Sequence, residues 1–385
     1  MTPILVGLAV ASPPHSITQA DAACQSVAAS VATKKQQRIA MKVYEKSGVS
    51  RRHSVLLQAS TNGAPAEQSF FLPPGDDEDL GPSTAARMRC YADSAVELAE
   101  RAARDALVDA DVAAEEITHL VTVSCSGFSA PGFDLGLFER LALTPGVART
   151  HVGFMGCHGA LNGLRVAGAF SRADPHACVL VVATEVCSLH YQYDWSPEHI
   201  VANSLFADGA AAVVVRNVLP QRAQRTGAAQ SPAAKHWRLT DSFSEVLPGT
   251  ADAMTWQIGD NGFEMTLSAA VPQLIRGELR RRIAPWLRRH GLDVDDVGSW
   301  AIHPGGPRIL DACEDALGLD DSALSASRDV LSAFGNMSSP TVLFVLEQLR
   351  RTGAASPCVM LGFGPGLCIE AAILESDSTL GTTSS

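Results

Sequence analysis

Short apolar runs alternate with longer amphipathic segments along most of the chain. The runs are four to eight residues long, which suits strands buried in a sheet, and the longer segments carry apolar residues at helical spacing. Because strands and helices alternate, we expect an α/β fold with largely buried sheets. The expected strands are residues 119–124, 178–185, 299–302 and 358–365, and the main expected helices are residues 95–107 and 271–289.

Three polar stretches interrupt this alternation. Residues 58–86 are rich in Pro, Gly and acidic side chains and indicate a long loop, while residues 220–236 are of low complexity and indicate a linker. Residues 376–385 indicate a disordered tail. The linker divides the chain into an N-terminal unit, residues 1–222, and a C-terminal unit, residues 237–375.

The two units look like copies of one another. In each, a helix is followed by a strand and then by a turn that opens on a polar residue. Cys125 and His303 open two of these turns, 178 positions apart. Cys157 and Asn336 are 179 positions apart, and the next pair of strands begins 180 positions apart. The near-constant offset indicates a duplication packed about a pseudo-twofold axis. Since sites in α/β folds gather where strands end and helices begin, we expect these four residues to converge.

Composition narrows the class of protein. A length of 385 residues allows two or three domains, and 46% hydrophobic against 18% charged residues exclude a disordered chain. The net charge of −11 makes a nucleic-acid partner unfavourable, so an anionic substrate would need a locally basic entrance. No apolar run approaches the length of a membrane span, and no secretory signal opens the chain. The nine cysteines lack metal-ligand spacing, so we expect a cytoplasmic protein with free thiols and no bound metal.

Cys157 is the strongest candidate for a nucleophile. It lies in the sequence Gly156-Cys157-His158-Gly159, where the glycines permit a sharp turn and residues 160–165 begin a helix. Most free cysteines are buried apolar residues, and we expect packing or cavity lining from the other eight. The positive end of the following helix would favour a Cys157 thiolate near neutral pH.

His303 and Asn336 extend the candidate site. His303 ends a strand before Pro304, and Asn336 lies in a turn that opens a helix. Taken alone, His303 could be a core histidine and Asn336 a helix cap. Together with Cys157, they would supply a covalent acyl carrier and two hydrogen-bond donors for a developing oxyanion.

Five short motifs lie in order along the chain. They are GFMGCHGA at residues 153–160, LFADGAAAVVV at 205–215, AIHPGGP at 301–307, GNMSS at 335–339 and GFGPGL at 362–367. These motifs resemble those of the type III polyketide synthases, the chalcone-synthase-like members of the thiolase fold, and the resemblance covers residues 4–374. It implies two duplicated α/β halves whose central sheets pack in alternating α-β-α-β-α layers.

The resemblance also implies a reaction. Cys157 would take an acyl starter from CoA as a thioester, while His303 and Asn336 would bind the thioester carbonyl of malonyl-CoA and stabilise the enolate formed as CO2 leaves. The carbanion would attack the Cys157 thioester in a Claisen condensation, repeated before cyclisation to a pyrone or a resorcinol/phloroglucinol-type product. Phe206 matches the family's gatekeeper phenylalanine. No metal, redox cofactor or acyl carrier protein is required.

Several binding positions follow from the same resemblance. Met265 replaces a usual phenylalanine and Trp256 a usual glycine, which favours an aliphatic starter of medium or long chain, as in bacterial alkylpyrone and alkylresorcinol synthases. Lys42, Lys46, Arg51 and Arg52 form the candidate basic entrance. Of the family's three basic positions for CoA phosphates, Lys42 and Lys46 match and the third falls on Ile39, with Arg38 and Lys35 nearby. The substrate-binding positions are Phe206, Cys125, Ser126, Cys187, His190, Trp256, Met265 and Ser338, and the CoA positions are Lys42, Lys46, Gly305, Gly306 and Arg308.

The family resemblance further implies a homodimer. In many members a Met-Pro pair reaches into the cavity of the partner subunit. Here the pair is Ala130-Pro131, which lacks the protruding side chain.

Other functions are compatible with parts of the pattern. A ketoacyl synthase III shares the Cys/His/Asn set but makes one condensation, and a chalcone or stilbene-type synthase would use an aromatic starter. A papain-like protease has the same residue order but carries its cysteine near the mature N-terminus, whereas Cys157 is mid-chain. A catalytically inactive thiolase-fold partner would have lost the cysteine or histidine, and both are present here.

Overall fold

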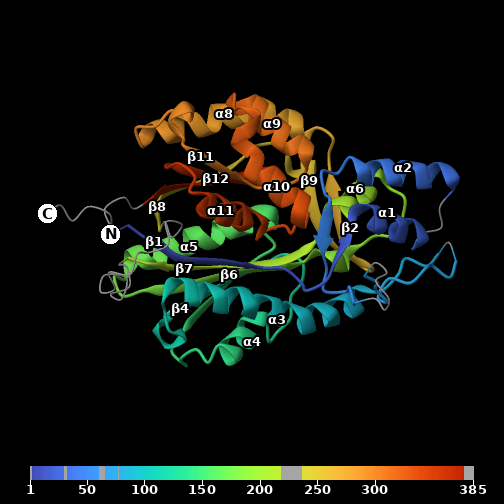
Figure 1. Ribbon diagram of the computed structural model, residues 1–385, viewed down its shortest axis with the longest axis horizontal. Coiled ribbons are helices and arrows are strands. Elements are labelled where there is room, and N and C mark those ends of the chain that lie inside the picture. Colours follow the sequence, from blue (N-terminus) through green and yellow to red (C-terminus); the bar gives the residue numbers. More distant parts are fainter. Residues whose placement is uncertain (1, 30–32, 60–65, 77, 218–235, 377–385) are drawn as a thin grey trace.

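A nine-stranded mixed sheet forms the framework of the molecule (Figure 1). The computed structural model describes residues 2–29, 33–59, 66–76, 78–217 and 236–376. The strands are β1 Ile4–Ala11, β2 Ser16–Thr18, β3 Arg51–His53, β4 His119–Ser124, β5 Ala148–Gly153, β6 Cys178–Val186, β7 Asp208–Arg216, β8 Trp237–Val246, β9 Met254–Gly259, β10 Gly262–Leu267, β11 Ser299–Ile302, β12 Cys358–Gly364 and β13 Cys368–Ser376. The order in the large sheet is β11-β12-β13-β8-β1-β7-β6-β4-β5, and the strand pairs β9-β10 and β2-β3 stand apart from it.

The sheet repeats the same arrangement on its two sides, which confirms the duplication. The order β1-β7-β6-β4 in one half corresponds to β8-β13-β12-β11 in the other. In each half the first two neighbouring pairs are antiparallel and the last pair is parallel. The structure corrects one detail: the two expected sheets are joined into one, because Ile4 and Leu5 of β1 pair with Arg238 and Trp237 of β8.

Helices cover both faces of each half and also fill the space between the halves. They are α1 Gln19–Ala28, α2 Lys34–Glu45, α3 Thr84–Ala110, α4 Phe133–Arg140, α5 Gly159–Ala173, α6 Pro197–Leu205, α8 Val271–Arg289, α9 Pro307–Leu317, α10 Ser325–Phe334 and α11 Thr341–Thr352. One core cluster packs α5 and α11 between the two halves of the sheet. Two more clusters place α3 and α4 on one outer face and α8 and α9 on the other. The five alternating layers of a thiolase-like fold are therefore present (Figure 1).

Most expected elements agree with the structure, and one helix is longer than expected. Strands 119–124 and 299–302 and helix 271–289 have the expected bounds. Helix α3 begins at Thr84, inside the expected loop 58–86, because the Ser83 hydroxyl caps its first turn. Its early turns bury Arg87, which donates to the carbonyl groups of Leu189 and Tyr191. Because Arg87 is charged yet lies on the buried face, the apolar pattern of the helix could not be recognised there.

The proposed division of the chain is only partly visible. The expected linker lies almost entirely within residues 218–235, and the expected tail beyond residue 376, so both fall outside the described residues. Within the described part of the chain, no helix is long and apolar enough to cross a lipid bilayer.

Candidate active site

Cys157 lies on a tight turn between a strand and a helix, as its flanking glycines predict. Strand β5 ends at Gly153, a single 3-10 turn covers Gly156–His158, and α5 begins at Gly159. Gly156 has a φ of 74°, and a Cβ atom there would lie 2.5 Å from Pro365 Cδ, so glycine is required at this position. The turn holds the sulfur just before the start of α5.

The surroundings of the Cys157 sulfur raise its pKa, which is opposite to the expectation from the sequence. Burial is the largest effect and the Glu185 carboxylate adds to it, whereas hydrogen bonds with Ser338 and Asn336 lower the pKa. Together these effects raise the pKa of the Cys157 thiol to about 11. A helix terminus contributes only about 0.3–1 kcal/mol at most sites, which is too little to offset burial. The resting site therefore holds a thiol that must lose its proton as it reacts.

Asn336 reaches Cys157 from the second half of the chain. Its backbone N–H donates to Leu205 O at 2.8 Å, and a backbone bridge pairs Asn336 with Phe206. Its side-chain Oδ1 accepts from Ser338 N at 2.8 Å, and its amide group is hydrogen-bonded to Cys157. The structure thus joins the nucleophile, the amide donor and Phe206 in one site.

His303 is buried at the end of β11 with its ring unpaired. Its backbone N–H donates to Leu361 O at 2.8 Å, but neither ring nitrogen has a hydrogen-bond partner among the described residues. Burial lowers the pKa of His303 to about 3, with a smaller contribution from His158, so the imidazole is neutral at pH 7. A Cβ atom on Gly305 would lie 3.8 Å from Nε2. A buried polar atom without a hydrogen-bond partner costs free energy. The ring of His303 therefore has a donor and an acceptor to offer to a substrate.

A buried carboxylate that the sequence motifs did not reveal lies behind Cys157. Glu185 of β6 accepts from the backbone N–H groups of Cys125 and Ser126, and from the Ser339 hydroxyl at 2.5 Å. Burial raises the pKa of Glu185, and these donors partly offset the effect. The Cys125 sulfur lies 3.3 Å from both Glu185 Oε1 and Ser338 Oγ. The sequence contains one signal for this buried carboxylate: Glu185 is the single acidic residue of the mainly apolar strand β6.

The expected starter positions line a cavity beside this site. The cavity encloses about 930 Å³, part of which is open to solvent. Trp256 and Met265 are paired across the β9-β10 hairpin, and Trp256 Nε1 donates to Cys125 O at 2.7 Å. Of the residues singled out from the sequence, the cavity wall contains Phe206, Cys187, His190, Trp256, Met265 and Arg52. Cys125, Ser126 and Ser338 lie on the Glu185 side instead.

His190 is a neutral part of this wall. Its Nε2 donates to Ser126 O at 2.6 Å, its Nδ1 accepts from Phe263 N at 2.9 Å, and burial lowers its pKa to about 3. The ring stacks on Phe263 with 4.2 Å between the centroids. The Gln192 side chain donates to the carbonyl groups of His190 and Phe263 and so joins them. Since backbone groups occupy both ring nitrogens, His190 shapes the cavity rather than exchanging protons.

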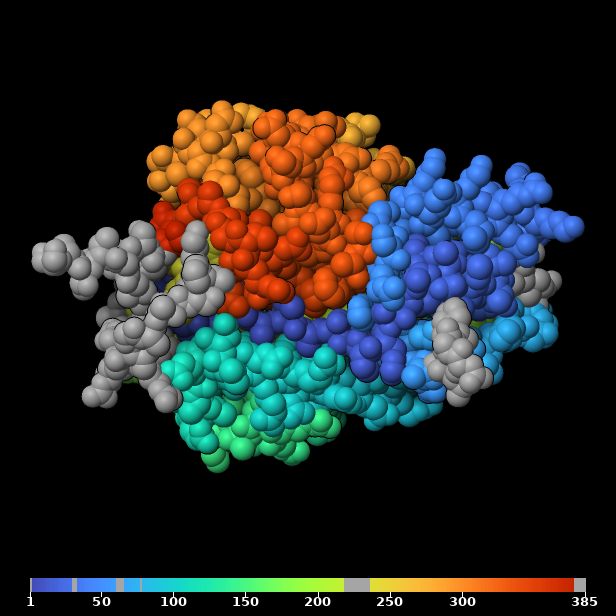
Figure 2. Space-filling model, viewed as in Figure 1, coloured from blue at the N-terminus to red at the C-terminus, as the bar shows by residue number. Residues whose placement is uncertain are grey.

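The expected CoA positions come from two parts of the chain that lie side by side. A Cβ atom on Gly48 would lie 2.8 Å from Pro307 Cγ, so the end of α2 adjoins the start of α9. Figure 2 shows the corresponding blue and orange surfaces in contact. The two parts carry Lys42, Lys46 and Arg308, all exposed, together with Gly305 and Gly306.

Arg52 does not belong to this exposed basic group. Its guanidinium turns inward and donates to the Phe206 carbonyl at 3.1 Å and to the Asn203 carbonyl. Arg52 therefore caps the C-terminal end of α6, where a cation is favourable. The peptide bond between Ala130 and Pro131 is cis, and both residues are exposed.

Comparison with known proteins identifies the family of the chain. The family models for the N-terminal and C-terminal domains of chalcone and stilbene synthases match residues 3–217 and 238–378. The chain is 32% identical to the alpha-pyrone synthesis polyketide synthase-like Pks18 of Mycobacterium tuberculosis, over 97% of this chain and 91% of that protein. It is 34% identical to the 1,3,6,8-tetrahydroxynaphthalene synthase of Streptomyces peucetius subsp. caesius, over 95% and 91% of the two chains.

A solved structure supports the same assignment. The crystal structure of PKS-I from the brown alga Ectocarpus siliculosus matches with a TM-score of 0.87 and 28% identity, over 97% of this chain and 98% of that one. The matches extend over both halves and include the segments that carry Cys157, His303 and Asn336. The chain therefore belongs to the chalcone and stilbene synthase family and is a type III polyketide synthase, an acyltransferase that joins acyl units by decarboxylative condensation.

Proposed function

We propose that this synthase loads an aliphatic acyl-CoA of medium or long chain on Cys157 and extends it repeatedly with malonyl-CoA. The observation that carries the proposal is the cavity beside Cys157, whose wall includes Trp256 and Met265. A flexible methionine leaves a path for an alkyl chain, while the indole occupies space that a bulky aromatic starter needs. Cyclisation of the extended chain then gives a pyrone or a resorcinol/phloroglucinol-type product.

In the loading step, the Cys157 sulfur attacks the thioester carbonyl of the starter. The new carbon–sulfur bond replaces the bond to CoA, and CoA leaves as a thiolate that takes up a proton. Because the Cys157 thiol has a raised pKa, it loses its proton to solvent before attack, and His303, with a pKa of about 3, stays neutral. Lys42, Lys46 and Arg308 supply positive charge for the CoA phosphates at the entrance.

In the extension step, His303 and the Nδ2 group of Asn336 donate hydrogen bonds to the thioester carbonyl of malonyl-CoA. These bonds stabilise the enolate left when the carbon–carbon bond to the carboxylate breaks and CO2 departs. Phe206, bridged to Asn336, presents an apolar surface to the departing carboxylate. The enolate carbon attacks the Cys157 thioester, which releases the thiolate and lengthens the chain by two carbons. Each step balances with protein groups and CoA thioesters alone, so the proposal includes no metal, redox cofactor or acyl carrier protein.

A panel of acyl-CoA starters tests the starter class. We expect hexanoyl-, decanoyl- and lauroyl-CoA to give multiply extended products with malonyl-CoA, detected by mass spectrometry, and coumaroyl-CoA to give little product. The double variant Trp256→Gly/Met265→Phe should improve the use of coumaroyl-CoA relative to decanoyl-CoA by about tenfold, because it restores space for a ring. Ile258→Ala, at an exposed position of the same hairpin, should leave the ratio unchanged. Exclusive use of coumaroyl-CoA would contradict the proposed class, and a product with a single extension would favour a ketoacyl synthase III-like enzyme.

We also propose that the enzyme is a homodimer. Strand β5 is the edge of the large sheet, and Phe128 and Phe154 beside it are 52% and 38% exposed. Unpaired edges and large exposed apolar side chains are typical of surfaces that pair with another chain. Light scattering should give twice the mass of the chain, and Phe128→Asp/Phe154→Asp should give a single chain, while Val108→Asp on the far end of α3 should not. A wild-type protein with the mass of one chain would rule out the dimer.

The nine cysteines form no disulfide. Free thiols suit a reducing compartment, so we place the enzyme in the cytoplasm.

A further inference from the structure

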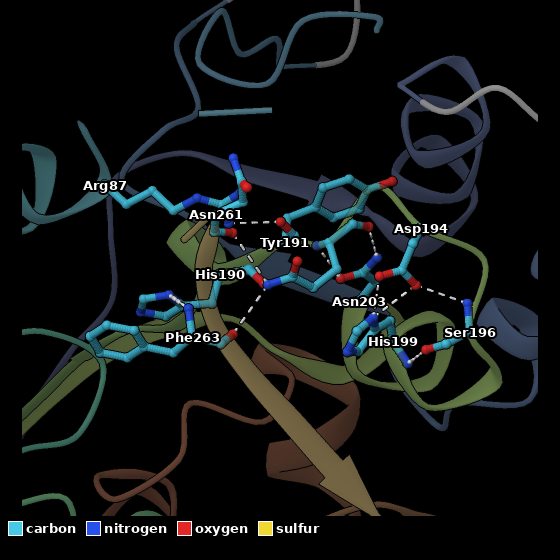
Figure 3. A network of polar contacts seen from close by, with 10 residues as sticks. Arg87, His190, Tyr191, Asp194, Ser196, His199, Asn203, Asn261 and Phe263 are labelled. Carbon is cyan, nitrogen blue, oxygen red and sulfur yellow. Dashed lines mark hydrogen bonds and ion pairs between the residues drawn. The ribbon is translucent and has the colours of Figure 1, made fainter. Parts of the chain in front are cut away.

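A histidine–carboxylate pair, His199 and Asp194, contributes His199 to the wall of the same cavity (Figure 3). The Nδ1 atom of His199 is 2.8 Å from Asp194 Oδ1 and 2.7 Å from Oδ2. Asp194 also accepts from Ser196 N at 2.9 Å, and the Ser196 hydroxyl accepts from His199 N at 3.1 Å. The first turn of α6 thereby fixes the ring. Nδ1–H faces the carboxylate, and Nε2 forms no hydrogen bond with any residue in the described part of the chain.

Helix α6 connects this pair to the reaction centre. His199 and Ala202 are three residues apart on one face of α6, Phe206 directly follows the helix, and all three line the cavity. At 1.5 Å per residue, His199 lies about 10 Å along the helix from Phe206. Phe206 is bridged to Asn336, whose side chain contacts Cys157. An acyl chain that leaves Cys157 along this wall therefore passes Phe206 first and His199 later.

The position of α6 is firmly held, so the two ends of the wall keep their spacing. The Asn203 side chain brackets the backbone of Gln192: its Oδ1 accepts from Gln192 N at 3.1 Å and its Nδ2 donates to Gln192 O at 2.7 Å. Tyr44 Oη and Arg52 donate to the Asn203 carbonyl from the other side. A fixed distance between a reactive group and a binding group is what a length-selective site requires.

The charges around His199 select the kind of group it can bind. The hydrogen bond with Asp194 raises the pKa of His199, and the carboxylates of Glu264 on β10 and Glu198 raise it further, against the effect of burial. These three acidic groups disfavour a second carboxylate or a phosphate at the site. A neutral oxygen is favourable, because a hydroxyl can donate to Nε2 of the neutral ring or accept from Nε2–H of the charged one. The rest of the wall includes the apolar side chains of Ala22, Ala29, Leu57 and Phe71.

We propose that the His199–Asp194 pair recognises a hydroxyl group on the aliphatic starter, about eight bonds or more from the region of Phe206. The distance follows from the span of about 10 Å and an advance of about 1.3 Å per bond in an extended chain. The inference rests on the proposed function, since it assumes an acyl chain in this cavity. His199 is a specificity-determining residue here, because it contacts the distal part of the starter rather than the reacting atoms.

Three starters and four variants test the proposal. The starters are hexanoyl-CoA, decanoyl-CoA and 10-hydroxydecanoyl-CoA, each with malonyl-CoA, and the measured quantity is kcat/KM for the first extension. The wild-type enzyme should prefer the hydroxylated over the plain ten-carbon starter by about tenfold, the usual effect of one hydrogen bond to a partly charged group. His199→Leu should remove the preference, Asp194→Asn should reduce it, and His199→Gln should keep part of it. Glu97→Gln, at an exposed position of α3 outside the cavity wall, should keep it.

The outcomes separate this inference from the proposed function. Equal use of the two ten-carbon starters by the wild-type enzyme overturns the role of the pair, while their extension leaves the proposed function intact. A preference that persists in His199→Leu also overturns it. Failure to extend any of the three starters contradicts the proposed function and, with it, this inference. The thermal midpoint of each variant reports whether it is folded. If His199→Leu is not folded, the wild-type comparison and the Asp194→Asn variant still test the role of the pair.

Discussion

Replacement of Cys157 by alanine should abolish acyl loading. The wild-type protein incubated with decanoyl-CoA should gain the mass of one decanoyl group, and Cys157→Ala should gain none and form no extended product. The reason is that only the Cys157 sulfur contacts Asn336 while lying on the turn before α5. Cys24→Ala, which removes an exposed thiol on α1, should load normally. An adduct on the Cys157→Ala protein, mapped to Cys125 or Cys187, would show that the nucleophile is misassigned. A wild-type protein that never loads would instead support an inactive partner protein.

The rate of this loading should rise with pH. Burial raises the pKa of Cys157 to about 11, so the thiolate fraction increases as the pH rises towards that value. Between pH 6.5 and 8.5 the increase should be roughly tenfold per unit if the thiolate forms before attack. A rate that is flat across this range would show that His303 or the helix terminus already holds the sulfur ionised, as the sequence alone suggested.

Loss of either oxyanion donor should slow the decarboxylation of malonyl-CoA by about 10²–10³-fold. The two assigned donors are the neutral His303 ring, whose nitrogens are unpaired among the described residues, and the Asn336 side chain, which is hydrogen-bonded to Cys157. We expect the loss in His303→Ala and in Asn336→Ala, measured as CO2 released in the absence of a starter. His303→Gln should lose less than His303→Ala, because the amide retains a donor.

Two further measurements complete this test. His176→Ala, which removes an exposed histidine on a loop, should decarboxylate at the wild-type rate. Decarboxylation at an unaltered rate in both His303→Ala and Asn336→Ala would refute the assigned roles. The family assignment has already set aside the protease alternative.

The sequence predicted those parts of the fold and site that depend on local pattern. The predicted bounds of strands β4 and β11 and of helix α8 are confirmed, since the apolar residues of each recur at the spacing of its element. The duplication seen in the sequence predicted that Cys157 and Asn336 converge, and the hydrogen bond between them confirms it. The contacts that bring their side chains within reach also depend on Ser338, which only the family resemblance indicated.

The features that escaped prediction depend on contacts between distant segments. Arg87 concealed the start of α3, because its partners are backbone carbonyl groups a hundred residues away. Glu185 is buried among donors from two other segments, and no local pattern shows that a carboxylate is stabilised in this way. The raised pKa of Cys157 likewise reflects burial by the whole fold, which outweighs the helix terminus visible in the sequence.

The central place of β1 in the sheet has a consequence for synthesis on the ribosome. Both neighbours of this strand, β7 and β8, lie about two hundred residues later in the chain. At about 5–20 residues per second, the apolar strand waits for roughly 10–40 seconds before it can pair. Nascent β1 is therefore a natural target for chaperones, and the two halves complete their folding together rather than one after the other.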